Sequence, residues 1–210
     1  MREVVAAGLE RLSSAGVSPT RFLLIRHAES AWNATGRWQG QADPPLSERG
    51  RSQAEAVAAD LVRTRFDVLI SSDLTRALET ARVIGHAAGI EPLVDGRLRE
   101  LDVGTWAGLG REEIARVDGD RLKRFESGDP DVHPGGGESR REIRQRVRRA
   151  LADLAARHVG RRVAVVTHLG VIRALLHGRE LGNAEWCEAA DSDLARPEPD
   201  AERASDAPPS

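Results

Sequence analysis

The chain has 210 residues, of which 40% are hydrophobic and 30% are charged, enough to build one domain with a substantial core. A formal net charge of −2 does not suggest a nucleic-acid surface, which needs clustered basic charge, and the single cysteine, Cys187, excludes an internal disulfide and a cysteine-based zinc cluster. No apolar run approaches the roughly 20 residues that span a bilayer, and the run from Val4 to Leu9 ends too soon for a signal peptide, so we expect a cytoplasmic protein with no membrane partner.

Hydrophobic periodicity predicts strands that alternate with helices. Residues 1–17 carry a weak amphipathic helical pattern, and Ser47 is the expected N-cap of the first clear helix. The predicted elements are, in chain order, a strand at 21–26, a helix at 47–63, a strand at 67–72, a helix at 74–88, a short strand at 92–95, a helix at 111–127, a Pro/Gly-rich loop at 129–137, a helix from about 138 to 158, a strand at 162–167 and a helix from 170 to about 177.

This alternation predicts an α/β fold, a three-layer α/β/α sandwich with a mostly parallel central sheet. We divide the chain into an N-terminal extension (1–19), a folded domain (20–187) and an acidic disordered tail (188–210), which is almost free of large apolar residues. A closing strand is not apparent after Leu181. A sheet that lacks this edge can use the edge of a second copy, so the sequence leaves a homodimer open.

Three of the predicted strands end at reactive side chains. Arg26 and His27 end the first strand, Arg76 follows the second strand closely, and His168 follows the last strand. Ligands bind beyond the carboxyl ends of parallel strands, so we expect these residues to lie together. Each residue alone has an ordinary alternative, because either histidine can serve structure only and Arg76 can support a helix terminus.

Together, these residue types suit phosphoryl transfer. The transferred group carries charge on several oxygens, and guanidinium groups can bind two or three of them. A neutral imidazole between the arginines can attack phosphorus, a second imidazole can donate to another oxygen, and the nearby positive charges keep the nucleophile unprotonated. The helix that begins near Gly170 can add backbone donors.

The order of the motifs resembles the histidine phosphatase superfamily, in its phosphoglycerate mutase-like branch. The matching segments span about residues 21–176, nearly the whole folded domain, which we therefore interpret as the catalytic domain. The segments are LIRHAESAWN, GQADPPLSERGRSQA, ISSDLTRALETA, LRELDVGTWAG, HPGGGES and VVTHLGVIRALL.

The resemblance implies roles for the residues at the strand ends. His27 corresponds to the nucleophile that forms a phosphohistidine, and Arg26, Arg76 and His168 correspond to the phosphate pocket. Family members act on small-molecule phosphate esters without a metal or another cofactor. The resemblance therefore implies a small-molecule substrate, no metal and no cofactor for this chain.

Three further residues match the family's substrate-binding segments. Asn33 corresponds to the asparagine that donates to phosphate, although it can also cap the turn at 34–36. Gln39 and Gly40 fall in the loop over the substrate, and both can be ordinary turn residues.

Glu100 corresponds to the family's proton donor. A leaving alkoxide needs a proton, and the like charge of a bound phosphate favours a protonated carboxyl. Without the resemblance, a salt bridge from Glu100 to Arg97 or Arg99 would be the simpler interpretation.

Hydrolysis is favoured over phosphoryl shuttling. The mutases carry an insertion with basic and tyrosine residues after the acid motif, whereas this chain has no tyrosine and a short path from Glu100 to the loop before Ser139. The resemblance is to small-molecule phosphatases, including those for glucosyl-3-phosphoglycerate and α-ribazole phosphate. Mutase-type transfer is the alternative.

Departures from the family pattern leave a non-catalytic, phospho-ligand-binding relative open. Ala28 replaces the usual glycine, and Leu169, which we place in the substrate-binding set, replaces a small residue beside the phosphate. A metal site is disfavoured, because no His-x-His pair adds further ligands to His27 and His168 and the neighbouring arginines repel a cation.

Overall fold

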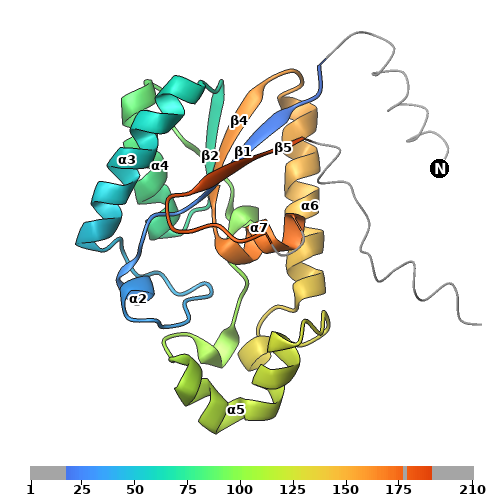
Figure 1. Ribbon diagram of the computed structural model, residues 1–210. Helices are drawn as coiled ribbons and strands as arrows, with labels where there is room; N and C mark the ends of the chain where they lie inside the picture. The colour runs from blue at the N-terminus through green and yellow to red at the C-terminus, as the bar shows by residue number, and fades with distance from the viewer. Residues whose placement is uncertain (1–17, 177–178, 191–210) are drawn as a thin grey trace, which may run out of the picture.

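A central sheet between two layers of helices forms the body of the protein, as the computed structural model shows for residues 18–176 and 179–190 (Figure 1). The strands are β1 (Arg21–Arg26), β2 (Val68–Ser71), β3 (Leu93–Val94), β4 (Arg162–Thr167) and β5 (Trp186–Ala190). The helices are α2 (Ala31–Ala34), α3 (Glu48–Thr64), α4 (Thr75–Ala88), α5 (Arg111–Glu126), α6 (Arg140–Arg157) and α7 (Leu169–Leu175), with short 3₁₀ helices at Gly96–Leu98, Gly104–Trp106 and Pro134–Gly136.

The sheet has the strand order β3-β2-β4-β1-β5. Its first four strands are parallel, and β5 is antiparallel to β1. The predicted fold class, a mostly parallel α/β/α sandwich, is therefore confirmed. In the β1–β4 register Arg26 pairs with Thr167, so the residues that follow these two strands leave the sheet at the same edge.

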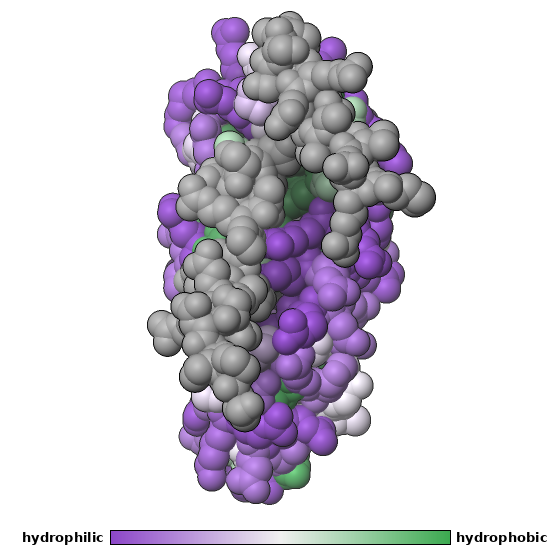
Figure 2. All heavy atoms as spheres, turned by 90° about the vertical axis from the view of Figure 1, so that its right-hand side faces the viewer, coloured by the Kyte–Doolittle hydropathy of each residue, from purple (hydrophilic) through white to green (hydrophobic). Residues whose placement is uncertain are grey.

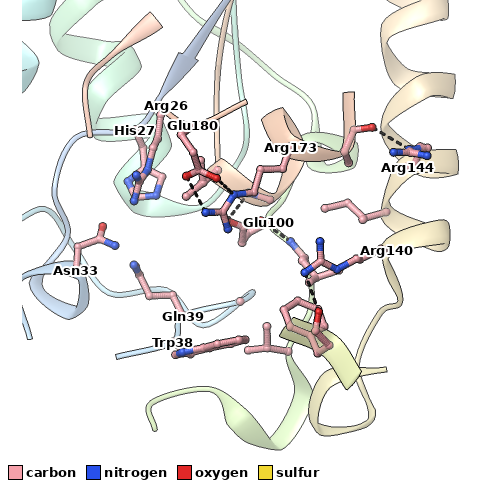
Figure 3. A pocket seen from close by; sticks show the side chains of 18 of the residues that line it. Arg26, His27, Asn33, Trp38, Gln39, Glu100, Arg140, Arg144, Arg173 and Glu180 are labelled. Carbon is pink, nitrogen blue, oxygen red and sulfur yellow. Dashed lines mark hydrogen bonds and ion pairs between the residues drawn. The ribbon is translucent and has the colours of Figure 1, made fainter. Parts of the chain in front are cut away.

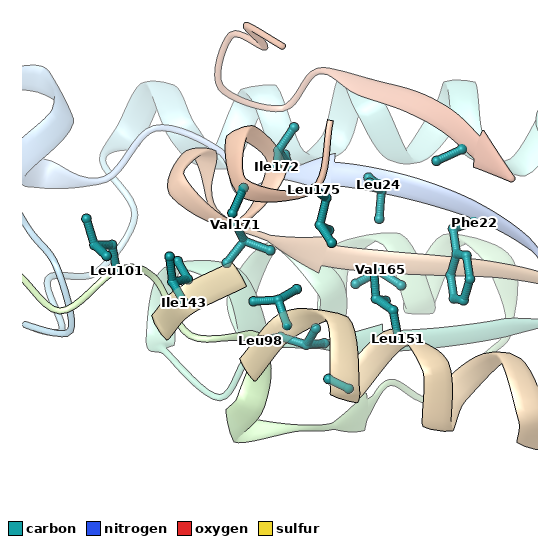
Figure 4. Packing of buried hydrophobic residues seen from close by; sticks show 14 of the residues in the cluster. Phe22, Leu24, Leu98, Leu101, Ile143, Leu151, Val165, Val171, Ile172 and Leu175 are labelled. Atoms are coloured by element: carbon teal, nitrogen blue, oxygen red, sulfur yellow. The ribbon is translucent and has the colours of Figure 1, made fainter. Parts of the chain in front are cut away.

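Alternate residues of the central strands pack into two separate cores. Phe22 and Leu24 of β1 and Val165 of β4 contact α6 and α7 on one face of the sheet (Figure 4). On the other face, Leu23 and Ile25 pack against α3 and α4. The residues of β1 between Phe22 and Ile25 are fully buried, which fixes the strand in the middle of the molecule. The reactive ends of the strands are therefore held on a rigid frame.

The structure contains a closing strand that the sequence did not make apparent. Strand β5 pairs with β1 over Arg21 to Ile25 and occupies that edge of the sheet, so the reason for expecting a second copy there is removed. It also runs across the boundary predicted between residues 187 and 188. The predicted helix at 1–17 and most of the predicted acidic tail lie outside the described residues, and the helix predicted from 170 ends at Leu175.

Helix α5 and its flanking loops form a separate end of the molecule beyond the sheet (Figure 1). An aromatic cluster joins this end to the body: the ring of Trp38 lies edge-on to Trp106 at 5.4 Å and to Phe125 at 5.6 Å, measured between centroids. Trp106 is 1% exposed, and its indole N–H donates to Asp118, where α5 kinks. The cluster holds α5 over the carboxyl ends of the strands.

The surface on the α6 side is largely hydrophilic where the described residues are in view (Figure 2). Among the described helices, none is both long and apolar enough to cross a membrane.

Candidate active site

A pocket of about 760 Å³ opens at the carboxyl end of the sheet. The backbone N–H of His27 donates to the carbonyl of Thr167 at 2.9 Å, and that of Ser72 donates to Val166 at 3.0 Å, so the ends of β1, β2 and β4 are tied together there. The predicted site residues that line the pocket are Arg26, His27, Asn33, Gln39, Gly40, Arg76, Glu100 and Leu169. Figure 3 shows Arg26, His27 and Asn33 at one end of it.

His27 is held as a neutral imidazole with its Nε2 lone pair available. Its Nδ1 lies 2.7 Å from the carbonyl oxygen of Ala28, which can only accept, so Nδ1 carries the proton. Nε2 accepts a long hydrogen bond of 3.3 Å from Nε of Arg76. Burial lowers the pKa of His27 well below its ordinary value, and the charges of Arg76 and Arg26 lower it further, although the bond to Ala28 raises it. The ring is therefore a base and nucleophile at neutral pH.

Arg76 is fully buried and carries no carboxylate partner among the described residues. Its Nη1 donates to the carbonyl of Ala42 and its Nη2 to that of Gly40, both at 2.8 Å. Gly40 has a φ of +51°, and a Cβ there would lie 2.7 Å from a methyl group of Val103, so only glycine fits this turn. The loop thus aims a buried cation at the pocket.

His168 adjoins His27, with 5.1 Å between the ring centroids, but it is fully buried behind the pocket wall. Its Nε2 lies 2.9 Å from Oγ of Ser72, and its Nδ1 has no protein partner. Oγ of Ser72 accepts the backbone N–H of Leu74 at 3.3 Å, and its hydroxyl proton can be donated to Nε2 of His168. In the tautomer that accepts this proton, Nδ1 carries the imidazole N–H. Burial lowers the pKa of His168 well below its ordinary value.

The amides of Asn33 and Gln39 are oriented by one serine. Ser30 is the N-cap of α2, and its backbone N–H donates to Oδ1 of Asn33 at 3.1 Å. The Ser30 hydroxyl lies 2.7 Å from Oε1 of Gln39. Asn183 also donates to Oδ1 of Asn33, at 3.3 Å, and to the carbonyl of His27, at 3.1 Å. Because the amide oxygens are occupied, the NH₂ groups of Asn33 and Gln39 are the ends left for a ligand.

The carboxylate of Glu100 is fixed by backbone donors rather than by the arginines beside it. Its Oε1 accepts from the N–H of Leu101 at 2.8 Å, and its Oε2 accepts from the N–H of Gly170 at 3.2 Å. Arg99 instead pairs with Asp73, so the salt bridge considered for Glu100 is not formed. A Cβ on Gly170 would lie 2.1 Å from Oε1 of Glu100. The start of α7 therefore sets the position of this carboxylate.

Arg26 lies between the sheet and the pocket. Its Nη1 donates to the carbonyl of Leu181 at 2.7 Å, while its buried Nε has no protein partner. Burial lowers the pKa of Arg26. The first residue of α7, Leu169, also lines the pocket and adds an apolar surface.

The outer part of the pocket combines aromatic and charged side chains. Trp38 and Phe125 form part of its wall, Arg140 lies on its far side from His27, and Arg173 lies between them in the view of Figure 3. Arg173 forms a two-pronged ion pair with Glu180, with distances of 2.8 and 2.7 Å.

Sequence reasoning missed several residues that position the site. Ser72 lies within a motif that was recognised, so its place beside a strand end was the available signal. Ser30 acts through near neighbours in sequence, and its spacing of three residues from Asn33 was the available signal. Asn183 contacts residues more than a hundred positions away, for which the chain offers no local signal. Among the described residues, no group of three or more His, Cys, Asp or Glu side chains is arranged to hold a metal ion.

Comparison with known proteins agrees with this geometry. The family model for the histidine phosphatase superfamily (branch 1) matches residues 22–195. Phosphoserine phosphatase 1 of Hydrogenobacter thermophilus is 39% identical over 155 residues, which cover 74% of each chain. Glucosyl-3-phosphoglycerate phosphatase of Mycobacterium tuberculosis is 40% identical over 191 residues, 80% of this chain and 84% of that protein. A mycobacterial glucosyl-3-phosphoglycerate phosphatase solved with VO₃ superposes with a TM-score of 0.73 at 37% identity, covering 80% of this chain and 91% of that one.

Proposed function

The chain belongs to the histidine phosphatase superfamily (branch 1) and is a hydrolase of small phosphate esters, and from this premise we propose which residues carry the reaction and what kind of ester it takes. The observation that carries the proposal is the orientation of His27. Its proton is held on Nδ1 by the Ala28 carbonyl, and the Nε2 lone pair lies at the pocket beside two guanidinium groups.

In the first step, Nε2 of His27 attacks phosphorus and the ester P–O bond breaks. Arg26, Arg76 and the NH₂ groups of Asn33 and Gln39 bind the phosphoryl oxygens, and Nδ1–H of His168 donates to one of them. Backbone carbonyls hold both guanidinium groups in place, and each group keeps further N–H donors for the phosphoryl oxygens. The products of this step are phosphohistidine and an alkoxide.

Glu100 supplies the proton that the alkoxide takes. Bound phosphate favours its protonated form through like charge, and proton transfer leaves the carboxylate that Leu101 and Gly170 bind. In the second step this carboxylate removes a proton from water, which attacks phosphorus and breaks the P–N bond. Phosphate leaves, and His27 and protonated Glu100 are restored. We propose that no metal or other cofactor takes part.

The pocket favours an ester larger than phosphoserine. A volume of about 760 Å³ lies in the range of sites for drug-sized ligands. Trp38 and Phe125 offer flat apolar faces, which suit the faces of a sugar ring. We therefore favour a glycosylated phosphoglycerate or a sugar phosphate, in line with the mycobacterial relative. Mutase-type transfer to a second substrate is the alternative.

For the location and partners of the enzyme, our proposal is the same as the expectation from the sequence. We propose a cytoplasmic enzyme that acts on a small molecule and needs no nucleic acid or membrane. The argument for a homodimer no longer applies, because β5 occupies the edge of the sheet beside β1. Size-exclusion chromatography with light scattering measures the oligomeric state directly.

The test is phosphate release, with EDTA present, from a panel of esters. The panel holds p-nitrophenyl phosphate, phosphoserine, both phosphoglycerates, glucosyl-3-phosphoglycerate, α-ribazole phosphate and several sugar phosphates. His27→Ala is expected to abolish release, whereas His86→Ala, an exposed histidine at the end of α4, keeps it. Labelled phosphate trapped on wild-type protein by alkaline quenching, and absent from His27→Ala, supports the intermediate. Turnover that survives in folded His27→Ala refutes the nucleophile.

A further inference from the structure

Arg140 is a cation that forms no ion pair with the described residues. It is the first residue of α6, its Nη2 donates to the carbonyl of Phe125 at 3.0 Å, and its Cζ lies 4.3 Å from the centroid of the Phe125 ring. Its Nε is buried and has no partner, and no described carboxylate pairs with it. Nearby arginines of the same helix differ, because Arg141 pairs with Asp131 and Arg146 with Glu138.

The surroundings of Arg140 are electrostatically unfavourable for a positive charge. The first turn of a helix carries the positive end of its dipole, which favours anions and repels cations. Burial lowers the pKa of Arg140, and the charge of Arg173 lowers it further. The Phe125 ring and the Phe125 carbonyl stabilise the charge in part, but neither is an anion that neutralises it. The arrangement is that of a site completed by an anion.

The charge of the whole pocket leads to the same conclusion. Six arginines line it against three glutamates, so positive side chains are in excess. Arg26 and Arg76 lie at the phosphate end with His27. Arg173 influences both Arg26 and Arg140, and in the view of Figure 3 it lies between His27 and Arg140. Arg140 is therefore a cation of the pocket that lies away from the phosphate end.

We infer that Arg140 determines specificity by binding a carboxylate of the substrate, at a point separate from the phosphate that His27 attacks. Arg173 flanks this subsite and pairs with Glu180, whereas Arg140 has no carboxylate partner within the part of the chain that the structure describes. The inference rests on the proposed function and narrows it, because it selects phosphorylated acids among the small esters that fit the pocket. A carboxylate suits a single guanidinium, whose parallel N–H groups can bind both of its oxygens, whereas a second phosphate would bring twice the charge.

The test compares matched pairs of esters that differ in one carboxylate. At three carbons the pair is 3-phosphoglycerate and glycerol 3-phosphate, and at six carbons it is 6-phosphogluconate and sorbitol 6-phosphate. In at least one pair, Arg140→Gln is expected to lower kcat/KM for the acid by about 10- to 100-fold, mainly through KM, and to leave the neutral ester within about threefold. The pair that responds gives the separation of the two subsites.

The control is Arg141→Gln, which removes the same charge from the next residue of α6, outside the pocket. It is expected to change neither pair, and Arg140→Lys is expected to restore part of the preference. The inference is overturned if Arg140→Gln changes kcat/KM, relative to wild type, by the same factor for the acid and the neutral ester in both pairs. The subsite binds a second phosphate and not a carboxylate if Arg140→Gln loses a preference for fructose 1,6-bisphosphate over fructose 6-phosphate while its kcat/KM for the acids is unchanged.

Failure of the proposed function is distinguished by binding. If wild-type protein turns over none of these esters, calorimetric titration of the same pairs into His27→Ala protein decides the inference alone. Weaker binding of an acid, but not of its neutral partner, after adding Arg140→Gln supports the subsite. Equal binding with and without Arg140 refutes it.

Discussion

Replacing Gly170 by alanine separates the position of Glu100 from the rest of the active site. The added Cβ would lie 2.1 Å from Oε1 of Glu100, so the carboxylate has to move. The obstacle is the far end of a flexible side chain, and the φ of Gly170 lies outside the left-handed region, so the helix itself accepts alanine. The substitution thus displaces the proposed proton donor without changing its carboxyl group.

The expected free-energy changes differ strongly between folding and catalysis. Alanine in a helix is favoured over glycine by up to about 1 kcal/mol, and the lost bond from Gly170 N–H to the carboxylate costs about 1.5–3 kcal/mol at most. The net change in unfolding free energy therefore stays within about 2 kcal/mol. General-acid catalysis contributes about 10²- to 10⁴-fold, or roughly 3–5 kcal/mol of barrier, for a poor leaving group.

The assay compares kcat/KM for an alkyl phosphate with that for p-nitrophenyl phosphate. This parameter reports phosphoryl transfer to His27 and not the later release of phosphate. We expect a loss of at least about 100-fold on the alkyl ester and less than about tenfold on p-nitrophenyl phosphate, whose leaving group needs no proton. Glu100→Gln should show the same pattern, and Gly119→Ala, with no atom within 4 Å of its new Cβ, should show none. Equal losses on both esters, or an unchanged alkyl rate, refute Glu100 as the proton donor.

Two further predictions concern the buried histidines. Because burial lowers the pKa values of His27 and His168 in the folded state, the unfolded chain binds more protons below about pH 6.5, and stability should fall as the pH drops through that range. Urea unfolding at pH 7.5, 6.5 and 5.5 should show that the unfolding free energy falls less as the pH drops in His27→Gln than in the wild type. An identical pH dependence of the unfolding free energy in both proteins contradicts the assignment. Ser72→Ala removes the partner of His168 Nε2 and should lower kcat/KM for all esters about tenfold or more, with Ser127→Ala as a surface control; an unaltered rate excludes a role for this hydrogen bond.

The parts of the fold that the sequence predicts are those with strong local patterns. Strands β1 and β4 are continuous apolar runs, and both are buried along nearly their whole length. Strand β5 was missed because only Cys187 and Ala189 point into the core, with Glu188 exposed between them. Two small inward side chains give little hydrophobic signal, and the strand is held largely by its antiparallel pairing with β1. Helix α2 has four residues and depends on the capping box of Ser30, which no periodicity can reveal.

The site residues also fall into those that the sequence predicts and those that it does not. His27, Arg76 and His168 follow strand ends, and a parallel sheet necessarily brings such residues to one edge. The outer pocket has no comparable rule. Helix α6 contains seven arginines in one charged pattern, and their sequence positions do not tell which of them meets a ligand. The distinction arises only from tertiary contacts: Asp131 and Glu138 neutralise two of the arginines, while Phe125 supports Arg140 without neutralising it. Substrate specificity in this enzyme is therefore expected to depend on which charges the fold leaves unpaired.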